Sequence, residues 1–422
     1  MPINIIITLA LLVLTAFILS RVFTLPKNIW LLFMTQPLIM AAAPVIVFIG
    51  GIVSSQIAST PTLATLPLTL MILGVAAGVV PAAMLAKKKG RKFAVYTGLS
   101  CALTAALIAI FALKIASFEL FVFASLLIGV GGGFNQQLRF AAIESSVNEE
   151  DIPKTLAILM LSGVFAAFLG PEIAVVGKDL LVSPYGYAGS FLLLAMLVCG
   201  AMLVMLFFKN PTMKTAIVVG EARDLTEIIK QPIFLIALCT AAIGFALMSY
   251  LMTATPISMH HMQGHSLQET KWVIQTHTAA MYLPSLVAPW LIKQLKLKGL
   301  MLMGALIYSA VAVIALSGHE VMHYWWALML LGIGWNFLFL TGTSLLPQSY
   351  RASERHKVQA TNDFVLFGFQ AMASLLAGWI LFTAGWHWVV LISLPFILVL
   401  FTVFYFYHRH DTKRSLVATN NN

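Results

Sequence analysis

Two ionisable side chains lie inside long apolar segments of this sequence. Glu172 lies in the apolar segment 155–177, and His277 lies in the segment 271–293. A charge inside the hydrocarbon core of a bilayer is costly, so such residues often mark a path for ions or substrate. Histidine changes its charge near neutral pH, and a neighbouring carboxylate favours its protonated form. Glu172 and His277 are therefore candidate proton carriers.

Both side chains also have simpler interpretations. Glu172 lies near one end of its segment, where lipid headgroups and water could solvate it. A histidine on an apolar helix is commonly satisfied by a hydroxyl or carbonyl group of a neighbouring helix.

The apolar segments that carry these residues are long enough to cross a bilayer. A spanning helix needs about 20 apolar residues and satisfies its own backbone hydrogen bonds. The sequence predicts an all-α integral membrane protein with spans at 29–52, 61–86, 93–114, 116–138, 155–177, 186–208, 232–258, 271–293, 299–317, 323–346, 359–385 and 387–408.

The composition agrees with a membrane protein. Of the 422 residues, 60% are hydrophobic and 9% are charged, and the mean hydropathy is +0.94, whereas soluble domains carry about 25% charged residues. The net charge of +10 does not indicate nucleic acid binding, because the basic residues lie in short clusters between spans. The three cysteines lie inside apolar segments and predict neither a disulfide framework nor a metal site.

The basic residues orient the chain. Of the 25 Lys and Arg residues, 22 fall in alternate gaps between the spans or at the ends of the chain. Only Lys114, Lys178 and Lys271 lie on the opposite side. Basic loops stay on the cytoplasmic side, so we expect a cytoplasmic carboxyl terminus.

Residues 3–20 form one more apolar segment. It has neither a basic start nor a small-residue cleavage site, which argues against a signal peptide. We predict an extra N-terminal helix that begins outside the cytoplasm. A helix lying along the membrane surface, or a start codon assigned too early, would also explain it.

The sequence repeats itself in two halves. LLIGVGGGFNQQ at 126–137 is answered by LLGIGWNFLF at 330–339, and KKKGRK at 87–92 by KQLKLK at 293–298. Two half-bundles that meet at a central cavity are the usual plan of a transporter. The predicted organisation is an extra helix at 1–28, six-helix bundles at 29–208 and 232–408, a cytoplasmic linker with a short surface helix at 209–231, and a cytoplasmic tail at 409–422.

Two motifs resemble those of the major facilitator superfamily, and the resemblance covers roughly 29–408. The superfamily loop G-x-x-x-D-R-x-G-R-[RK] is matched in AMLAKKKGRK by Gly90, Arg91 and Lys92, while Ala83 and Lys87 depart from it. The exporter motif G-x-x-x-G-P of the fifth helix is partly matched in AAFLGPEIA, at 166–174. Gly170 and Pro171 match the end of the motif, and Ala166 replaces its first glycine. The resemblance implies a secondary transporter, and the partial exporter motif favours efflux.

The resemblance also implies where charged residues act. In the superfamily the fifth and eighth helices face each other, so we predict that Glu172 and His277 form a protonatable outer gate. At the cytoplasmic ends of spans, we predict a charge lock made by Arg91, Glu144, Arg139 and Asp363. Helix capping by Asp363 and simple anchoring by Arg139 are alternative roles.

Substrate is expected in a central cavity lined by the first, fourth, seventh and tenth spans. The polar and aromatic candidates are Gln36, Asn135, Gln136, Ser249, Tyr250, Thr253, Trp335, Asn336 and Thr341. Such side chains also join helices to each other without touching substrate.

The predicted function is proton-coupled transport of a small molecule by alternating access. The sequence has no nucleotide-binding motif and no catalytic motif such as H-E-x-x-H or G-x-S-x-G, so neither an enzyme activity nor a cofactor is expected. His260, His261 and His265 could bind a transition metal, although a solvated loop explains them better. A non-transporting sensor or a membrane enzyme is the alternative. We expect a monomer in the bacterial cytoplasmic (inner) membrane.

Overall fold

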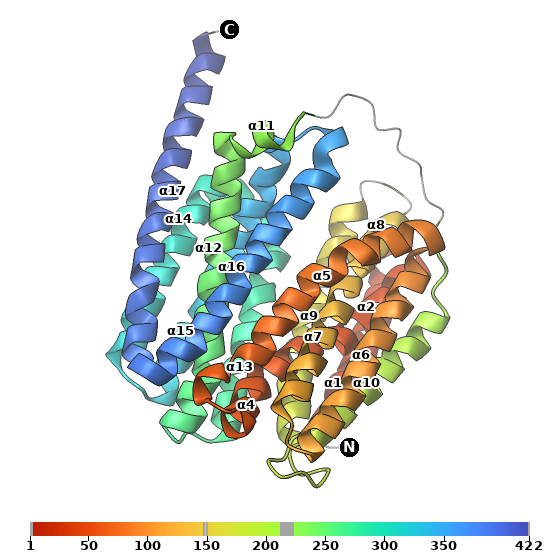
Figure 1. Cartoon of the computed structure of the whole chain (residues 1–422). Helices are drawn as coiled ribbons and strands as arrows, with labels where there is room; N and C mark the ends of the chain where they lie inside the picture. The colour runs from red at the N-terminus through yellow and green to blue at the C-terminus, as the bar shows by residue number, and fades with distance from the viewer. Residues whose placement is uncertain (1–2, 147, 149–150, 212–222, 421–422) are drawn as a thin grey trace.

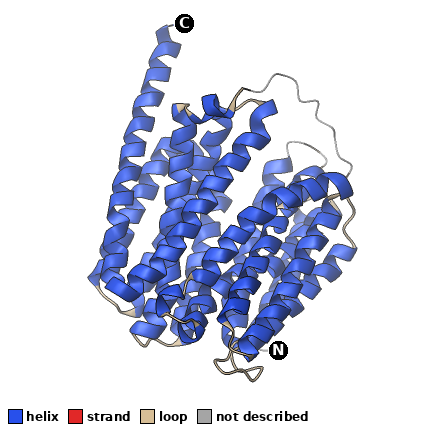
Figure 2. Cartoon of the chain, viewed as in Figure 1, coloured by secondary structure: helices blue, strands red, loops and turns tan. Residues whose placement is uncertain are grey.

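A computed structural model describes residues 3–146, 148, 151–211 and 223–420 of the chain. Within these ranges every regular element is a helix and no strand occurs (Figure 2). This agrees with the prediction of an all-α membrane protein, because helices satisfy their backbone hydrogen bonds without help from water.

The first part of the chain contains the extra helix and six further membrane-crossing segments. Their elements are α1 (Ile3–Val22), α2 (Lys27–Met40), α3 (Ala42–Val45), the π-helical η1 (Ile46–Gly50), α4 (Gly51–Ile57), the 3₁₀ turn η2 (Pro61–Leu63), α5 (Leu66–Lys89), α6 (Arg91–Lys114), α7 (Phe118–Asn135), α8 (Gln137–Ser145), α9 (Ile152–Val176) and α10 (Ala188–Leu206).

The second part follows the same plan. Its elements are α11 (Leu225–Ile229), α12 (Pro232–Pro256), the π-helical η4 (Ile257–Met262), α13 (Leu267–Tyr282), the 3₁₀ turn η5 (Leu283–Val287), α14 (Ala288–Ser317), α15 (Val321–Leu345), the 3₁₀ turns η6 (Leu346–Ser349) and η7 (Ala352–Glu354), α16 (Arg355–Ala384) and α17 (Trp386–Asn420).

Twelve of these segments are long and apolar enough to cross a membrane, and α1 is one of them. The predicted span at 271–293 does not form one helix that is long enough to cross a membrane, because it is built in two pieces. Its α-helix ends at Tyr282, a 3₁₀ turn follows at Leu283–Val287, and α14 begins at Ala288. Pro284 lies in the turn, and its missing N–H and ring interrupt a helix. The sequence pattern predicted one continuous helix there.

The linker contains α11, a helix of 5 residues, in the stretch where a short surface helix was expected. Residues 212–222 of that linker lie outside the described residues. The segment after 408 continues α17 as a helix to Asn420.

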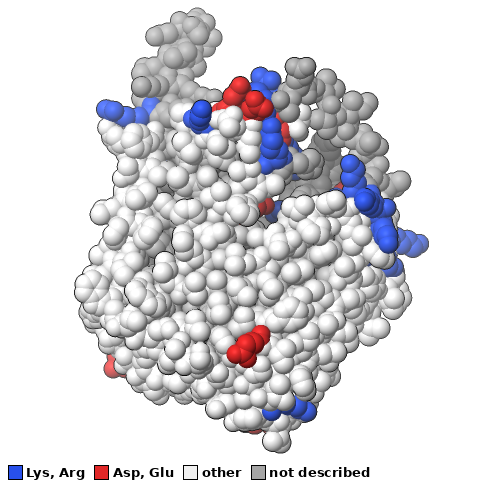
Figure 3. Space-filling model, in the orientation of Figure 1, with Lys and Arg blue, Asp and Glu red and all other residues white. Residues whose placement is uncertain are grey.

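The helices form two bundles that lie side by side (Figure 1). α1 packs beside the first bundle, against α9 and α2. The amino and carboxyl ends of the chain lie at opposite ends of the molecule (Figure 1). Most of the blue Lys and Arg side chains on the visible face lie at the end where α17 finishes (Figure 3). By the positive-inside rule we assign that end to the cytoplasm.

Glycines bring corresponding helices close together in both halves. In the first half, a Cβ at Gly98 of α6 would lie 3.1 Å from the Gly131 carbonyl of α7. In the second half, a Cβ at Gly304 of α14 would lie 3.3 Å from the Gly334 carbonyl of α15. The equivalent helix pairs thus use glycines at matching places, which supports the internal repeat. Small residues are the usual means of close packing between membrane helices.

The closest approach is made by α5 and α7. A Cβ at Gly129 would overlap the Met71 carbonyl, and a Cβ at Gly74 would overlap the Leu126 carbonyl. Both obstacles are backbone atoms, which cannot turn aside as a side chain can. The glycine run at 129–133 therefore serves helix packing.

We predict that Gly129→Ala destabilises the protein and Gly200→Ala does not. Overpacking at the α5–α7 contact is expected to cost about 1–3 kcal/mol or more. A Cβ at Gly200 of α10 would meet only Leu38 Cδ1 at 3.8 Å, an ordinary contact. Thermal unfolding in detergent measures the difference. Equal midpoints for the two variants would contradict the tight packing of α5 on α7.

Candidate functional site

The two bundles are joined by polar contacts at their outer end. Among the described residues, three hydrogen-bonding contacts cross between the bundles. Lys271 Nζ lies 2.8 Å from Glu172 Oε2, Gln275 Nε2 donates to the Phe168 carbonyl at 3.2 Å, and Thr65 Oγ1 donates to the Leu375 carbonyl at 3.3 Å. All of these residues lie toward the ends of their helices that face away from the basic side.

The first two contacts form a ladder between α9 and α13, which we call the outer ladder: Phe168, Glu172, Lys271 and Gln275. Phe168 and Glu172 are four residues apart on α9, as are Lys271 and Gln275 on α13. Residues four apart lie on one face of a helix. Each helix therefore presents one face to the other, and the polar groups meet in register.

The ion pair of the outer ladder is largely shielded from solvent. The side chains of Lys271 and Glu172 are 12% and 9% exposed. The second carboxylate oxygen of Glu172 accepts a hydrogen bond from Asn4 Nδ2 of α1 at 2.9 Å. A buried pair with further hydrogen bonds holds its partners strongly, because removing one of them leaves the other charge uncompensated.

The predicted gate residues have separate partners in this structure. His277 is fully buried and its Nδ1 lies 2.7 Å from the Leu328 carbonyl of α15. Its Nε2 is a buried atom without a hydrogen-bond partner among the described residues. Glu172 is held by Lys271 and Asn4 instead. The structure thus places Glu172 between the bundles and His277 between two helices of the second bundle.

At the cytoplasmic side, the structure brings Arg91 and Glu144 together. Arg91 Nε donates to Glu144 Oε2 at 3.0 Å, and Nη1 donates to the side-chain oxygen of Gln137. The guanidinium also lies over the Phe140 ring. These contacts fix the turn between α5 and α6 to α8 within the first bundle.

Gly90 makes that turn possible. Gly90 is the single residue between α5 and α6, and its φ is 88°. Left-handed φ values favour glycine, and a Cβ at this position would also meet the side chain of Asn210. Asn210 in turn accepts a hydrogen bond from the Lys92 backbone N–H.

Arg139 and Asp363, the other two residues of the predicted lock, lie close enough for their charges to interact but are not bonded to each other. No ion pair or hydrogen bond between them occurs in the described part of the chain. Arg139 is exposed and lies over the Phe140 ring, while Asp363 accepts a hydrogen bond from Asn362 Nδ2 at 3.1 Å. The described hydrogen bonds and ion pairs between the bundles thus lie at the outer end.

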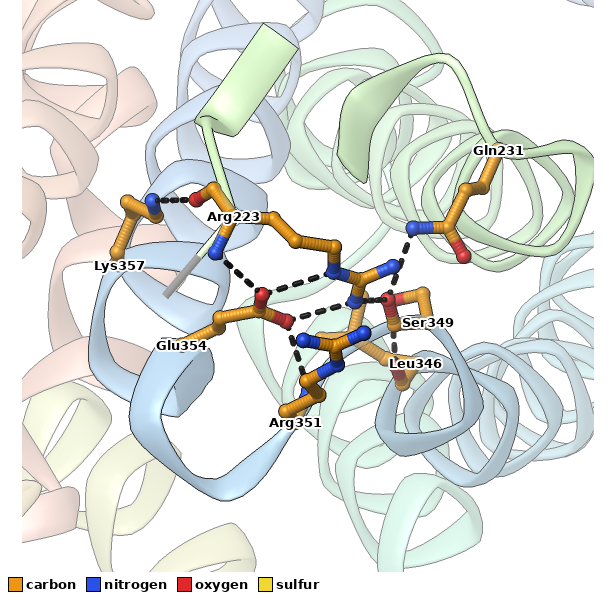
Figure 4. Close-up of polar contacts among 7 residues, drawn as sticks. All are labelled: Arg223, Gln231, Leu346, Ser349, Arg351, Glu354 and Lys357. Atoms are coloured by element: carbon orange, nitrogen blue, oxygen red, sulfur yellow. Dashed lines mark hydrogen bonds and ion pairs between the residues drawn. The ribbon is translucent and has the colours of Figure 1, made fainter. Parts of the chain in front are cut away.

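The second bundle has its own cytoplasmic ion pair (Figure 4). Glu354 of η7 accepts hydrogen bonds from Arg223 Nε at 2.8 Å and Nη2 at 2.7 Å, and from the Arg351 backbone N–H at 2.8 Å. The Glu354 side chain is 0% exposed. Hydrogen bonding to Arg223 holds the pKa of Glu354 well below its ordinary value. This cluster attaches the end of the linker to the second bundle.

A cluster of aromatic rings lies on α12, α15 and α16 of the second bundle. Trp335 stacks on Phe339 with ring centroids 5.1 Å apart and an interplanar angle of 4°. Phe245 packs edge-on against both rings, at 5.0 Å and 5.4 Å, and reaches Phe367 at 6.5 Å. We call these four residues the aromatic cluster. Such rings bind flat apolar molecules by stacking.

Several predicted cavity residues have buried polar atoms without a partner. Tyr250 Oη, Trp335 Nε1, Asn135 Oδ1 and Asn336 Oδ1 are buried and make no hydrogen bond within the described chain. An unsatisfied buried polar group costs about 1–3 kcal/mol. Groups left in this state at a functional site are available to a ligand.

Other predicted cavity residues join helices. Gln36 Nε2 donates to the Leu159 carbonyl of α9. Asn336 Nδ2 donates to the Met281 carbonyl and to Ser285 Oγ, which ties α15 to the broken end of α13. Thr253 contacts Ser374 on α16 and the Ser249 carbonyl of its own helix. Thr341 bonds within α15, and Gln136 caps α7.

The outer histidines bond to loop backbone. His260 Nδ1 lies 2.8 Å from the His265 carbonyl, and His265 Nε2 lies 2.7 Å from the His319 carbonyl. No group of three or more His, Cys, Asp or Glu side chains suited to a metal ion occurs among the residues the structure describes.

The family model of the Major Facilitator Superfamily matches residues 28–368 and again 251–420. The chain belongs to the Major Facilitator Superfamily. Superfamily membership accounts for the two bundles and establishes a multi-pass transporter rather than an enzyme. The resemblance in the sequence motifs is thereby confirmed.

Among curated superfamily proteins, the riboflavin transporter RfnT of Brucella anthropi is 33% identical over 378 residues, covering 88% of this chain and 94% of RfnT. The uncharacterized MFS-type transporter YdeG of Bacillus subtilis is 29% identical over 79% of this chain and 81% of its own. The multidrug resistance protein MdtL of a Shewanella species is 26% identical over 62% of this chain and 65% of its own.

A solved superfamily structure has the same fold. The bacterial homologue of the human lysosomal transporter Spinster, in an inward-facing and unoccupied conformation, aligns with a TM-score of 0.67 at 14% identity and covers 90% of this chain and 96% of its own.

Sequence reasoning missed Lys271 as the partner of Glu172. It counted Lys271 only as one of three basic residues on the outer side, although opposite charges at equal depth on facing helices signal a pair. It also missed Asn4, Phe245, Phe339 and Phe367. Aromatic residues on the seventh and tenth spans were visible, but their contacts depend on how each helix is rotated.

We predict that reversing one charge of the outer ladder opens the outer side. Glu172→Lys and Lys271→Glu each place like charges together, and breaking a buried pair costs roughly 3–5 kcal/mol. The double variant restores opposite charges and should restore closure.

A cysteine at Ser54 reports the opening. Ser54 is buried on α4, one turn from Gly51, where a Cβ would meet Ile257 of the second bundle. With Cys101, Cys199 and Cys239 replaced by Ser, a membrane-impermeant maleimide added to cells should label Ser54→Cys faster in both single variants. Unchanged labelling in the single variants would contradict a closing role for the pair.

Proposed function

We propose that this protein transports riboflavin, or a flavin of similar size, by alternating access. Two observations support the proposal. RfnT, named as a riboflavin transporter, is 33% identical over nearly the whole of both chains. The aromatic cluster contains the buried, unpartnered Nε1 of Trp335, and rings with such a donor have the chemistry that a flavin requires. This observation carries the proposal.

The isoalloxazine ring of a flavin is flat, aromatic and edged with hydrogen-bond donors and acceptors. Trp335 and Phe339 already stack on each other, so a flavin would extend this stack from an outer face of the pair. Trp335 Nε1 and Tyr250 Oη offer donors, and Asn135 Oδ1 offers an acceptor. A ligand that satisfies these atoms removes the free-energy cost of leaving them buried and unpaired.

The charge of the cavity residues also suits a flavin. The predicted substrate residues are neutral, and riboflavin is neutral near pH 7. A neutral ligand avoids the large cost of bringing a charge into a low-dielectric site.

Alternating access would exchange one set of contacts for another. The outer ladder joins the bundles in this conformation. In the opposite conformation, we propose that Arg139 or Arg91 reaches Asp363 and closes the cytoplasmic side. Substrate can shift the balance only by binding the two conformations with different affinity.

We further propose that transport is coupled to protons. Glu172 is the carboxylate that holds Lys271 across the bundles, so its protonation would weaken the outer ladder. His277, with a buried unpartnered Nε2, is the second candidate. The partial exporter motif of the fifth helix keeps efflux as the predicted direction.

Purified protein in liposomes tests the transport proposal. We expect an imposed proton gradient to accelerate riboflavin flux. In the Glu172→Gln variant we expect flux that no longer responds to the gradient. Liposomes with the gradient in either orientation give the direction. Flux of cationic drugs without riboflavin flux would overturn the proposed substrate and favour a role like that of MdtL.

We predict that Trp335→Ala weakens riboflavin binding roughly 5- to 150-fold, since aromatic stacking of a base is worth about 1–3 kcal/mol. Trp335→Phe should keep part of the affinity. Trp379→Ala is the matched control, because Trp379 on α16 is 54% exposed at the bundle surface. Quenching of flavin fluorescence measures binding. Equal affinity in the Trp335→Ala and Trp379→Ala variants would exclude the aromatic cluster as the site.

A further inference from the structure

α1 lies outside the two six-helix bundles and exposes most of its apolar surface. Only 17% of its membrane-crossing window is buried, and its buried residues are Ile5, Leu12 and Ala16. Such a helix could serve as a membrane anchor alone. Its polar residues show whether it does more.

Asn4 makes the one side-chain hydrogen bond that leaves α1 among the described residues. Its Nδ2 donates to Glu172 Oε1 at 2.9 Å. The other polar side chains of α1 bond within the helix: Thr8 Oγ1 to the Asn4 carbonyl, and Ser20 Oγ to the Phe17 carbonyl. The single polar link of α1 thus ends on the carboxylate of the outer ladder.

The two oxygens of Glu172 have different partners. Oε1 accepts from Asn4 of α1, and Oε2 faces Lys271 of α13 at 2.8 Å. A free glutamate side chain samples several rotamers, and fixing one has an entropic cost. The hydrogen bond from the Asn4 amide holds one orientation of the carboxylate, so less conformational entropy remains to be lost when Lys271 pairs with the other oxygen.

We propose that α1 is a latch for the outer side of the transporter, with Asn4 as its positioning residue. Asn4 holds Glu172 in the orientation that Lys271 requires and so favours the conformation closed at the outer end. The Asn4–Glu172 hydrogen bond joins α1 to α9 of the first bundle, and not to α13 of the second. α1 would therefore move with the first bundle when the bundles separate at the outer end. The inference rests on alternating access in the proposed function and is independent of the substrate.

The Ser54→Cys reporter tests the latch in intact cells without any substrate. Asn4→Ala should raise the rate of labelling from outside by roughly tenfold, as expected for losing a hydrogen bond to a charged group. Asn4→Gln keeps an amide and should recover part of the closure. Ser20→Ala, which removes a hydroxyl of the same helix that bonds only to the Phe17 carbonyl, should label at the rate of the parent.

A second background separates positioning from a structural role. With Lys271→Met, Glu172 has lost its partner across the bundles, so Asn4→Ala should add no further labelling. Labelling at the parent rate in Asn4→Ala, or an equal rise with and without Lys271, would overturn the latch. Failure of riboflavin flux with intact Asn4-dependent labelling would overturn the substrate alone.

Discussion

The ion pair between Glu172 and Lys271 is the only ion pair within 4 Å that joins the bundles among the described residues. Its strength depends on its surroundings. Two charges a few ångströms apart attract weakly in water and much more strongly in a medium of low dielectric. The pair is therefore stable while the outer end is dry, and it weakens once water enters. This dependence favours two distinct states, closed and open, over a continuum between them.

The remaining ion pairs hold each bundle together instead of joining them. Arg91 and Glu144 fix α8 to the α5–α6 turn, and Arg223 and Glu354 fix the linker to the second bundle. Each bundle can then move as a rigid body, with its cytoplasmic end braced. Arg139 and Asp363 are left out of these pairs, so a lock between them breaks neither pair. A lock through Arg91 would have to draw it away from Glu144.

Apolar length can be counted along the chain, so the sequence predicted most of the membrane-crossing helices, α1 included. The orientation in the membrane stays a prediction from the placement of Lys and Arg. The break of α13 at Leu283–Val287 escaped prediction, because hydropathy stays high through the 3₁₀ turn. Asn336 supports this break by bonding Met281 and Ser285, a contact between distant parts of the chain that no local pattern reveals.

The predicted pairing of Glu172 with His277 also depended on a contact that no local sequence pattern reveals. Depth in the membrane follows from position along a helix, but the direction of a side chain depends on how the helix is rotated. His277 and Lys271 are six residues apart on α13, which places them roughly 120° apart around a helix of 3.6 residues per turn. His277 therefore meets α15 when Lys271 meets α9. Gln275, four residues from Lys271, shares its face and contacts Phe168.

In the proposed transport cycle, the free energy of ligand binding at the aromatic cluster must offset the free energy lost when the outer ladder breaks. A ligand that stacks on Trp335 and satisfies Tyr250 and Asn135 would stabilise whichever conformation brings those groups closest to it. Moving a two-state equilibrium from 1:99 to 99:1 requires a difference in binding free energy of about 5.5 kcal/mol. The free energy of the outer ladder must be of comparable size or smaller for substrate to drive opening. A single ion pair with a few neutral hydrogen bonds meets that condition, whereas an extensive charged network between the bundles would not.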